Sequence, residues 1–289
     1  MKKIHILLFA LLFLGACAED ELNPKSIFDQ KVERSDFDQW LLKNYVETYN
    51  VELKYRLEDK ESQMQYNLTP ADYNKSIAMA KLAKFLWFES YEELLGKTFI
   101  RAYSPRIIHL VGSSAYNPNS GSRVVGTAEG GLKVTLYDVN TLNMNDLDIN
   151  ELNKTFFHTM HHEFAHILHQ TKEYPVEFNL ISAEKYTSSD WINLSDADAL
   201  KIGFVTRYGS SETQEDFVEL ISIYVTSSAT QWNNRMAVAG STGKPIIDKK
   251  MGIVRNYLKT SWDIDIDKLR DIILRRSSEV STIDLTTLK

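Results

Sequence analysis

The sequence predicts an α+β fold, in which a helical first part leads into a small mixed sheet and then into a long helix and a C-terminal helical part. Three observations predict it. Apolar residues recur at helical spacing in two stretches between residues 35 and 87, alternate with polar residues in stretches between residues 99 and 139, and return to helical spacing from Asp148 onward.

The first residues are expected to be a targeting segment. Lys2 and Lys3 precede an almost unbroken apolar run, Ile4–Leu14, which is too short to span a bilayer as a helix. The tetrapeptide Leu14–Cys17 then resembles a bacterial lipobox, which implies cleavage before Cys17 and a lipid on that cysteine. An ordinary secretory signal is the alternative.

Cys17 is the only cysteine, which excludes an internal disulfide and a cysteine-ligated metal cluster. The acidic stretch 18–21 that follows resembles the surface-export signal of Bacteroidetes lipoproteins, with a solvated linker as the alternative. We therefore expect a signal peptide at 1–16, a lipid-anchored tether at 17–33 and one domain at 34–289, held on the outer membrane and exposed at the cell surface.

The charge of the mature chain argues against nucleic acid as a partner. Without residues 1–16 the chain has 31 basic and 39 acidic residues, a net charge of −8. Nonspecific binding to nucleic acid or to anionic membranes requires a basic surface. No later apolar run reaches 18 residues, so the lipid is the expected membrane attachment.

Capping and periodicity place the elements of the first half. A helix is expected after Ser35, and another after Thr69, which would be its N-cap with Pro70 in the first helical position. Strands are expected at 51–57, at 99–111 with an interruption at Pro105, and at 124–139 with a kink at Gly130-Gly131.

The second half is expected to be helical. Asp148–Thr171 is the longest expected helix, and a loop-rich stretch follows it from Lys172 to Leu194. Later helices are expected to begin at Ser195, to cover 212–227 after a cap at Ser210 or Ser211, and to cover 249–260 and 265–277.

The sequence His162-Glu163-Phe164-Ala165-His166 lies within the longest expected helix. Two histidines four residues apart lie on one helical face, and both imidazoles can bind one zinc ion. Glu163 points about 100° away around the helix. From there it can take a proton from a zinc-bound water without binding the metal. The alternative is an amphipathic helix with solvated histidines.

Other histidines surround this motif. His158 and His169 lie near the same stripe, and His161 precedes the first ligand. They can shape a pocket, donate hydrogen bonds to groups around the metal or form a polar face. None is expected to bind zinc.

A third ligand is needed, since zinc in a hydrolytic site usually has three protein ligands and an open position. A histidine ten residues after His162 is absent, because Lys172 stands there. Glu215 and Glu219 lie four residues apart on a mostly apolar helix, where buried carboxylates need a compensating positive charge. One of them can bind zinc while the other orients a ligand histidine. An exposed acidic helix start is the alternative.

The segment Tyr208–Glu219 resembles the part of anthrax lethal factor that carries its third zinc ligand and a tyrosine above the metal. The resemblance implies that Glu215 binds zinc, that Tyr208 stabilises the oxyanion and that Glu219 supports a ligand. It covers only this segment and His162–His166, and it implies a gluzincin-type site in a zincin-like fold.

A wider resemblance covers most of the mature chain. The lipobox, the helical first part and both motifs are similar to the zinc-binding metallopeptidase lipoproteins of Bacteroidetes, which are associated with outer-membrane nutrient import systems. This implies a Zn²⁺-dependent hydrolase of peptide or protein substrates. We expect the substrate to lie along an edge strand within Leu132–Tyr137, by main-chain pairing. The alternatives are a non-catalytic substrate-capture subunit of an importer with a structural zinc, and a zinc hydrolase of another bond, such as a deacylase.

Overall fold

The computed structural model describes residues 33–58, 65–116, 118, 121, 123, 124, 126–129 and 132–288. The expected signal peptide, Cys17 and the tether up to residue 32 lie outside the described residues. The chain divides into two units, Met1–Ser35 and Asp36–Lys289, and the second unit contains all the elements below. None of the described helices has the length and apolar character that crossing a membrane requires.

The first helical part is built from segments that run into one another. It consists of α2 (Asp36–Leu41), η1 (Leu42–Val46), α3 (Glu47–Tyr49), α4 (Tyr73–Ala83), η3 (Lys84–Phe88), α5 (Glu89–Leu95) and α6 (Lys97–Tyr103). The expectation that Thr69 is the N-cap of α4 is wrong. Asp72 is the N-cap, and its side chain accepts a hydrogen bond from Lys75 N. Pro70 instead forms an isolated β-bridge with Val111.

The sheet has four strands in the order β1-β2-β6-β5, formed by Glu52–Lys54, Ile107–Leu110, Lys133–Leu136 and Gly126–Glu129. The first three strands are parallel, and β5 pairs with β6 antiparallel, so the sheet is mixed as predicted. A separate antiparallel pair joins β3 (Ala115–Tyr116) to β4 (Arg123–Val124).

Two strand expectations are wrong. Residues 97–103 form α6, because the apolar side chains of Phe99, Ile100 and Tyr103 also fit helical spacing. The expected substrate strand, 132–137, contains β6, which lies inside the sheet between β2 and β5. Both of its edges already carry backbone hydrogen bonds, so a substrate cannot pair with it. Among the described strands, β1 and β5 are the edges of this sheet.

The long helix predicted after Asp148 is present and is continuous over three segments, α7 (Ile149–Leu152), η5 (Asn153–Phe157) and α8 (His158–Thr171). Asp148 caps it by accepting a hydrogen bond from Asn150 N. Buried Phe164 faces away from the histidine stripe and packs edge-on against Trp87 and Tyr91 of the first helical part.

The C-terminal part is helical. It contains α9 (Glu177–Ile181), η6 (Ser188–Asn193), α10 (Asp196–Ile202), η7 (Tyr208–Ser210), α11 (Thr213–Thr226), α12 (Ala229–Trp262), α13 (Ile266–Glu279) and η8 (Val280–Thr282), and a short turn, η4 (Val139–Thr141), follows the sheet. The helices α10 and α13 begin where expected, and the side chains of Ser195 and Asp265 cap them. No side chain caps α11, where Ser210 or Ser211 was expected to do so.

The helix α12 is much longer than the predicted 249–260. It has 34 residues, with non-helical dihedral angles at Gly240 and a proline at position 245. Glycines and a proline usually end helices, which explains why its first half was not predicted. Gly243 allows the helix to touch α10, because a Cβ atom there would lie 1.9 Å from Leu200 O.

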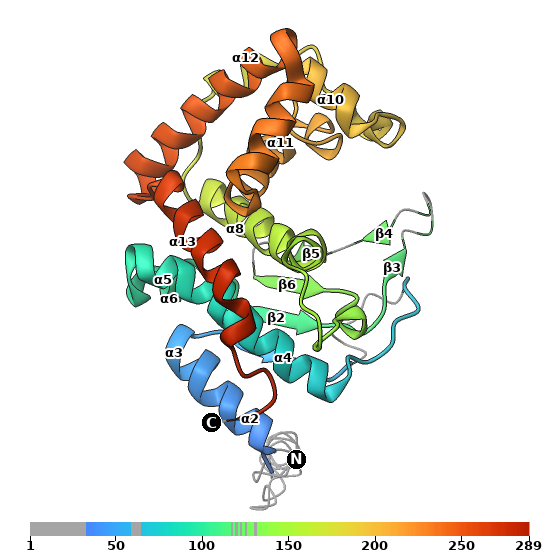
Figure 1. Ribbon diagram of the computed structural model, residues 1–289, viewed down its shortest axis with the longest axis vertical. Coiled ribbons are helices and arrows are strands. Elements are labelled where there is room, and N and C mark those ends of the chain that lie inside the picture. Colours follow the sequence, from blue (N-terminus) through green and yellow to red (C-terminus); the bar gives the residue numbers. More distant parts are fainter. Residues whose placement is uncertain are drawn as a thin grey trace, which may run out of the picture. The chain divides into compact units, whose positions relative to one another are not determined.

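The elements place α8 between the sheet and the C-terminal helices. It packs against α11 on one side and lies next to β5 on the other (Figure 1). The histidine motif therefore lies where the edge strand and α11 approach the same helix.

Candidate metal centre

The two predicted ligand histidines meet a carboxylate from α11. Glu215 Oε2 lies 3.1 Å from His162 Nε2 and 3.5 Å from His166 Nε2. Ligand atoms about 2.0–2.2 Å from a tetrahedral zinc ion lie roughly 3.3–3.6 Å from one another. The two distances from Glu215 are close to this spacing, and the ligand atoms of all three residues lie within 4.8 Å of one another, so together they could hold one metal ion.

Glu215 Oε2 is also a buried oxygen without a hydrogen-bond partner. Such atoms are rare in folded proteins, and each needs a physical explanation. The two imidazole nitrogens are close to this oxygen but are not aligned to donate hydrogen bonds to it. A cation between the three atoms would satisfy all of them, so the donor set fits zinc.

The charged groups of His162, His166, Glu215 and Glu219, which we call the ring cluster, are arranged around the His162 ring. Burial alone would lower the pKa of His162, but the adjacent carboxylates of Glu215 and Glu219 raise it to about 10. Burial opposes the charge of Glu215 as well, yet His162 and His166 hold the pKa of that carboxyl at about 2. The carboxylates thus attract positive charge to a place where a divalent cation can replace the proton.

Glu219 lies on the other side of the His162 ring. Its Oε1 atom is 2.8 Å from His162 Nδ1, and its Oε2 atom accepts a hydrogen bond of 2.6 Å from Thr206 Oγ1. His158 Nε2 lies 2.9 Å from Oε1, although it is not in line for a hydrogen bond. Burial disfavours the charged form, but His158 and His162 keep the pKa of Glu219 well below its ordinary value.

His166 is supported by a second histidine. Its Nδ1 atom lies 2.9 Å from His169 Nε2. Burial, followed by the neighbouring His166, lowers the pKa of His169 to about 4, so its ring is neutral at physiological pH. Tyr174 packs edge-on against His169 and stacks on Phe217 of α11. His169 thus holds the second ligand ring from the core side.

Glu163 and Tyr208 lie beside the cluster. Burial raises the pKa of Glu163, and Glu215 raises it further against the opposing effect of His162 and His166. The Tyr208 ring lies 6.0 Å from the His162 ring and packs edge-on against Trp191 at 5.1 Å. Burial and the nearby carboxylates raise the pKa of Tyr208, so its hydroxyl keeps its proton.

The structure thus brings together the six predicted residues of the site: His162, Glu163, His166, Tyr208, Glu215 and Glu219. Sequence reasoning missed Thr206 and Trp191, because neither belongs to a motif and both reach the site only through packing. It also missed the buried ion pair between Asp216 and Lys250, whose atoms lie 2.6 Å apart. Asp216 follows Glu215 directly on a mostly apolar helix, where a buried carboxylate needs a cationic partner.

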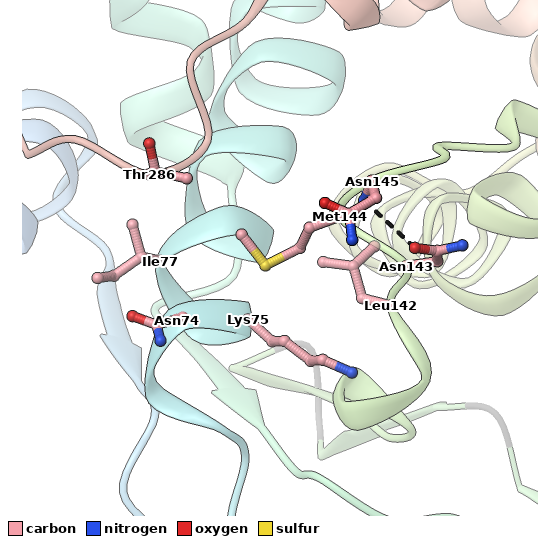
Figure 2. Close-up of a pocket in the computed structure, with 8 residues that line it drawn as sticks. All are labelled: Asn74, Lys75, Ile77, Leu142, Asn143, Met144, Asn145 and Thr286. Carbon is pink, nitrogen blue, oxygen red and sulfur yellow. Dashed lines mark hydrogen bonds between the residues drawn. The ribbon is translucent and has the colours of Figure 1, made fainter.

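A cavity of about 530 Å³ lies elsewhere, between α4 and residues 142–145 (Figure 2). Asn74, Ile77, Met144 and Thr286 are among its lining residues, and none of the residues of the ring cluster lines it. The ammonium group of Lys75, which also lines it, already donates to Asn140 O at 2.5 Å. This cavity plays no part in the metal centre.

Comparison with known proteins also points to zinc binding. Residues 30–267 match the protein family described as "Putative zinc-binding metallo-peptidase". A crystal structure titled as a putative zinc-binding metallo-peptidase from Bacteroides caccae ATCC 43185 is similar to the chain, with a TM-score of 0.78 and 46% identity, over 91% of this chain and 100% of that one. No curated protein matches. Because this match covers most of the chain, the chain belongs to this family of zinc-binding metallopeptidases.

Proposed function

We propose that this protein is a peptidase of the gluzincin type, with His162, His166 and Glu215 as its zinc ligands. The observation that carries the proposal is the unpartnered Glu215 Oε2, which faces two imidazole nitrogens at 3.1 and 3.5 Å. When bound, zinc supplies a Lewis acid that polarises a carbonyl and makes water more acidic.

Glu163 is the proposed general base and acid. It lies next to His162 in the sequence and on the partly exposed face of α8. A carboxyl group with a raised pKa holds a proton more readily near neutral pH. Glu163 therefore takes the proton of the attacking water and delivers it to the leaving amine.

Tyr208 is the proposed donor to the oxyanion. Its side chain is 37% exposed, so it can reach a substrate beside the ring cluster. Its hydroxyl keeps its proton and can donate to the negative charge that develops on the carbonyl oxygen. Trp191 packs against the ring and limits its motion.

Glu219 is proposed to position a ligand. By accepting from His162 Nδ1 it orients the ring so that Nε2 faces Glu215 Oε2. Partners of this kind contribute about 10–100-fold to metal affinity or activity. Thr206 donates to the second oxygen of Glu219 and keeps the carboxylate in place.

The proposed path of the substrate is along β5. This strand pairs with β6 on one side, and no described strand pairs with its other side. It also lies next to α8. A peptide can add to such an edge through main-chain hydrogen bonds.

We further propose that the protein is anchored through Cys17 in the outer membrane and faces the cell surface, where a nutrient import complex is a partner. The support is the sequence Leu14–Cys17 and the acidic stretch after it.

The proposal is tested by cleavage of a peptide library with the zinc-loaded protein, with and without a chelator. Glu163→Gln should bind zinc and lose about 10²–10⁴-fold in hydrolysis. The exposed Glu173→Gln, on the loop after α8, is the matched control and should cleave normally.

Full activity of Glu163→Gln would remove the role assigned to this residue. Zinc binding without cleavage of any peptide would favour the substrate-capture subunit. Among the described residues, however, the groups that could hold one ion have three members each, His162 with His166 and Glu215 or His162 with His158 and Glu219, whereas a structural zinc site has four ligands. Hydrolysis of an acyl bond alone would favour the deacylase.

A further inference from the structure

A second cavity, of about 380 Å³, lies beside the second half of α8. Its lining includes Tyr103 at the end of α6, Arg106 after that helix, Leu132 before β6, and Ile167 and Gln170 on α8. We call it the Arg106 pocket. None of the residues of the ring cluster lines it.

The surface of α8 connects the Arg106 pocket to Glu163. Glu163, His166, Ile167 and Gln170 reach solvent and follow the spacing of one helical face, while the residues between them are largely buried. At 1.5 Å per residue, Ile167 and Gln170 lie about 6 and 10 Å along the axis from Glu163. An extended peptide advances about 3.3 Å per residue, so the pocket lies two or three residues from the bond at Glu163.

The pocket is held open by backbone hydrogen bonds. Arg106 N and Ile107 N both donate to Leu132 O, at 2.8 and 3.0 Å. The guanidinium of Arg106 donates to Arg101 O and Ala102 O, both at 2.8 Å, at the C-terminal end of α6. The walls and the cation are therefore positioned before any ligand binds.

The charge of this pocket is not compensated by an acidic side chain. Arg106 forms no ion pair with the described residues, and no acidic residue is among those that line the cavity. The chain as a whole has a net charge of −6, so a cationic pocket beside its active helix is a local exception. Leu132, with 63% of its side chain exposed, and Ile167 add apolar walls.

We infer that the Arg106 pocket binds an acidic side chain of the peptide substrate, two or three residues from the scissile bond. The inference rests on the proposed peptidase function. The methylene groups of a glutamate would contact Leu132 and Ile167, and its carboxylate would lie near Arg106. A lysine at the same substrate position would be repelled by that cation.

The test uses peptides that differ only in one residue, Glu, Gln or Lys, placed in turn at each position around the cleavage site. Cleavage is measured with the zinc-loaded wild-type protein. Binding of the same peptides is measured by fluorescence anisotropy with the zinc-loaded Glu163→Gln variant, which does not depend on hydrolysis. We expect Glu to be preferred over Lys by about tenfold at one position, from an attraction in one case and a repulsion in the other.

Two variants locate the preference. Arg106→Gln should reduce it to less than about threefold, since the cation is gone. Gln170→Glu should reduce it equally by adding a negative charge on the exposed face of α8, without disturbing the α6 carbonyls. Arg101→Gln is the matched control: its guanidinium donates to Glu47 O and Thr48 O, and it does not line the pocket.

The inference is overturned if the preference for Glu persists in both Arg106→Gln and Gln170→Glu. It is also overturned if neither cleavage by the wild-type protein nor binding to Glu163→Gln shows the preference. If the wild-type protein cleaves no peptide, the proposed function fails. The binding series in Glu163→Gln then decides the pocket separately, by showing the preference for Glu or its absence.

Discussion

Replacing Lys250 by methionine should destabilise the protein by about 1–3 kcal/mol at pH 7, because a buried carboxylate loses its cation and must take up a proton, and a backbone carbonyl loses its donor. Lys250 and Asp216 are each 1% exposed, and their charged atoms lie 2.6 Å apart. Lys250 also donates to Gly203 O, and Tyr186 donates to Asp216. The pair joins α12 to α11 one residue from Glu215, so the same change tests how the third ligand is held.

Protonation limits the size of this loss. Burial raises the pKa of Asp216 to about 6 even beside Lys250, and removal of the ammonium raises it further. The ordinary pKa of this carboxyl is 3.8. Keeping it protonated at pH 7 therefore costs about 4.4 kcal/mol, at 1.36 kcal/mol for each pH unit. The wild-type protein, in which the pKa of this carboxyl is about 6, already bears about 3 kcal/mol of that cost, so the carboxyl group accounts for about 1.4 kcal/mol of the loss in the variant.

The loss should therefore depend on pH. Because the folded pKa of Asp216 lies above the unfolded pKa, folding is favoured as the pH falls toward the unfolded value. Between pH 7 and pH 5 the variant gains about 2.7 kcal/mol from this group and the wild-type protein about 1.4. The difference between them should narrow by about 1.3 kcal/mol.

Urea unfolding of chelator-treated protein at pH 7 and pH 5 measures both effects. The double variant Lys250→Met with Asp216→Leu should recover at least half of the loss, because no buried charge remains. Lys244→Met is the surface control, because Lys244 and its partner Asp248 are both about half exposed. This variant should change the free energy of unfolding by less than about 1 kcal/mol. A loss below about 1 kcal/mol in Lys250→Met, or a loss equal at both pH values, would refute the reasoning.

Three further predictions follow from the site and the packing. Glu215→Ala should weaken zinc binding more than Glu219→Ala in a metal titration, and the reverse order would make Glu219 the ligand. Tyr208→Phe should lower kcat by about 10²–10³-fold and leave zinc affinity unchanged, whereas an unaltered kcat would exclude the hydroxyl from the reaction. Gly243→Ala should destabilise the fold by about 1–3 kcal/mol in thermal unfolding, because its Cβ would overlap a backbone carbonyl of α10. Gly252→Ala should not destabilise the fold, because its Cβ would meet nothing within 4 Å. Equal melting temperatures of the two variants would contradict this packing.

Local signals predicted three helix starts correctly, whereas the caps expected at Thr69 and at Ser210 or Ser211 are wrong. Asp148, Ser195 and Asp265 cap the helices that the sequence assigned to them, since a cap needs only a side chain and a nearby backbone N–H. The failures lie where apolar spacing fits two structures or where tertiary contacts override a local rule. Residues 97–103 form a helix instead of a strand, and α12 consists of two helices joined across a kink at Gly240, of which only the part from residue 249 was predicted.

The sequence by itself determined that His162, Glu163 and His166 share one helix and that its histidines face one point, because helical geometry alone sets that spacing. Only the tertiary structure decided which carboxylate of α11 faces them. Glu215 and Glu219 lie on the same face of their helix, and the packing of α11 against α8 puts one beside the Nε2 atoms and the other beside His162 Nδ1. That choice depends on the offset between two helices distant in sequence, which no local pattern records.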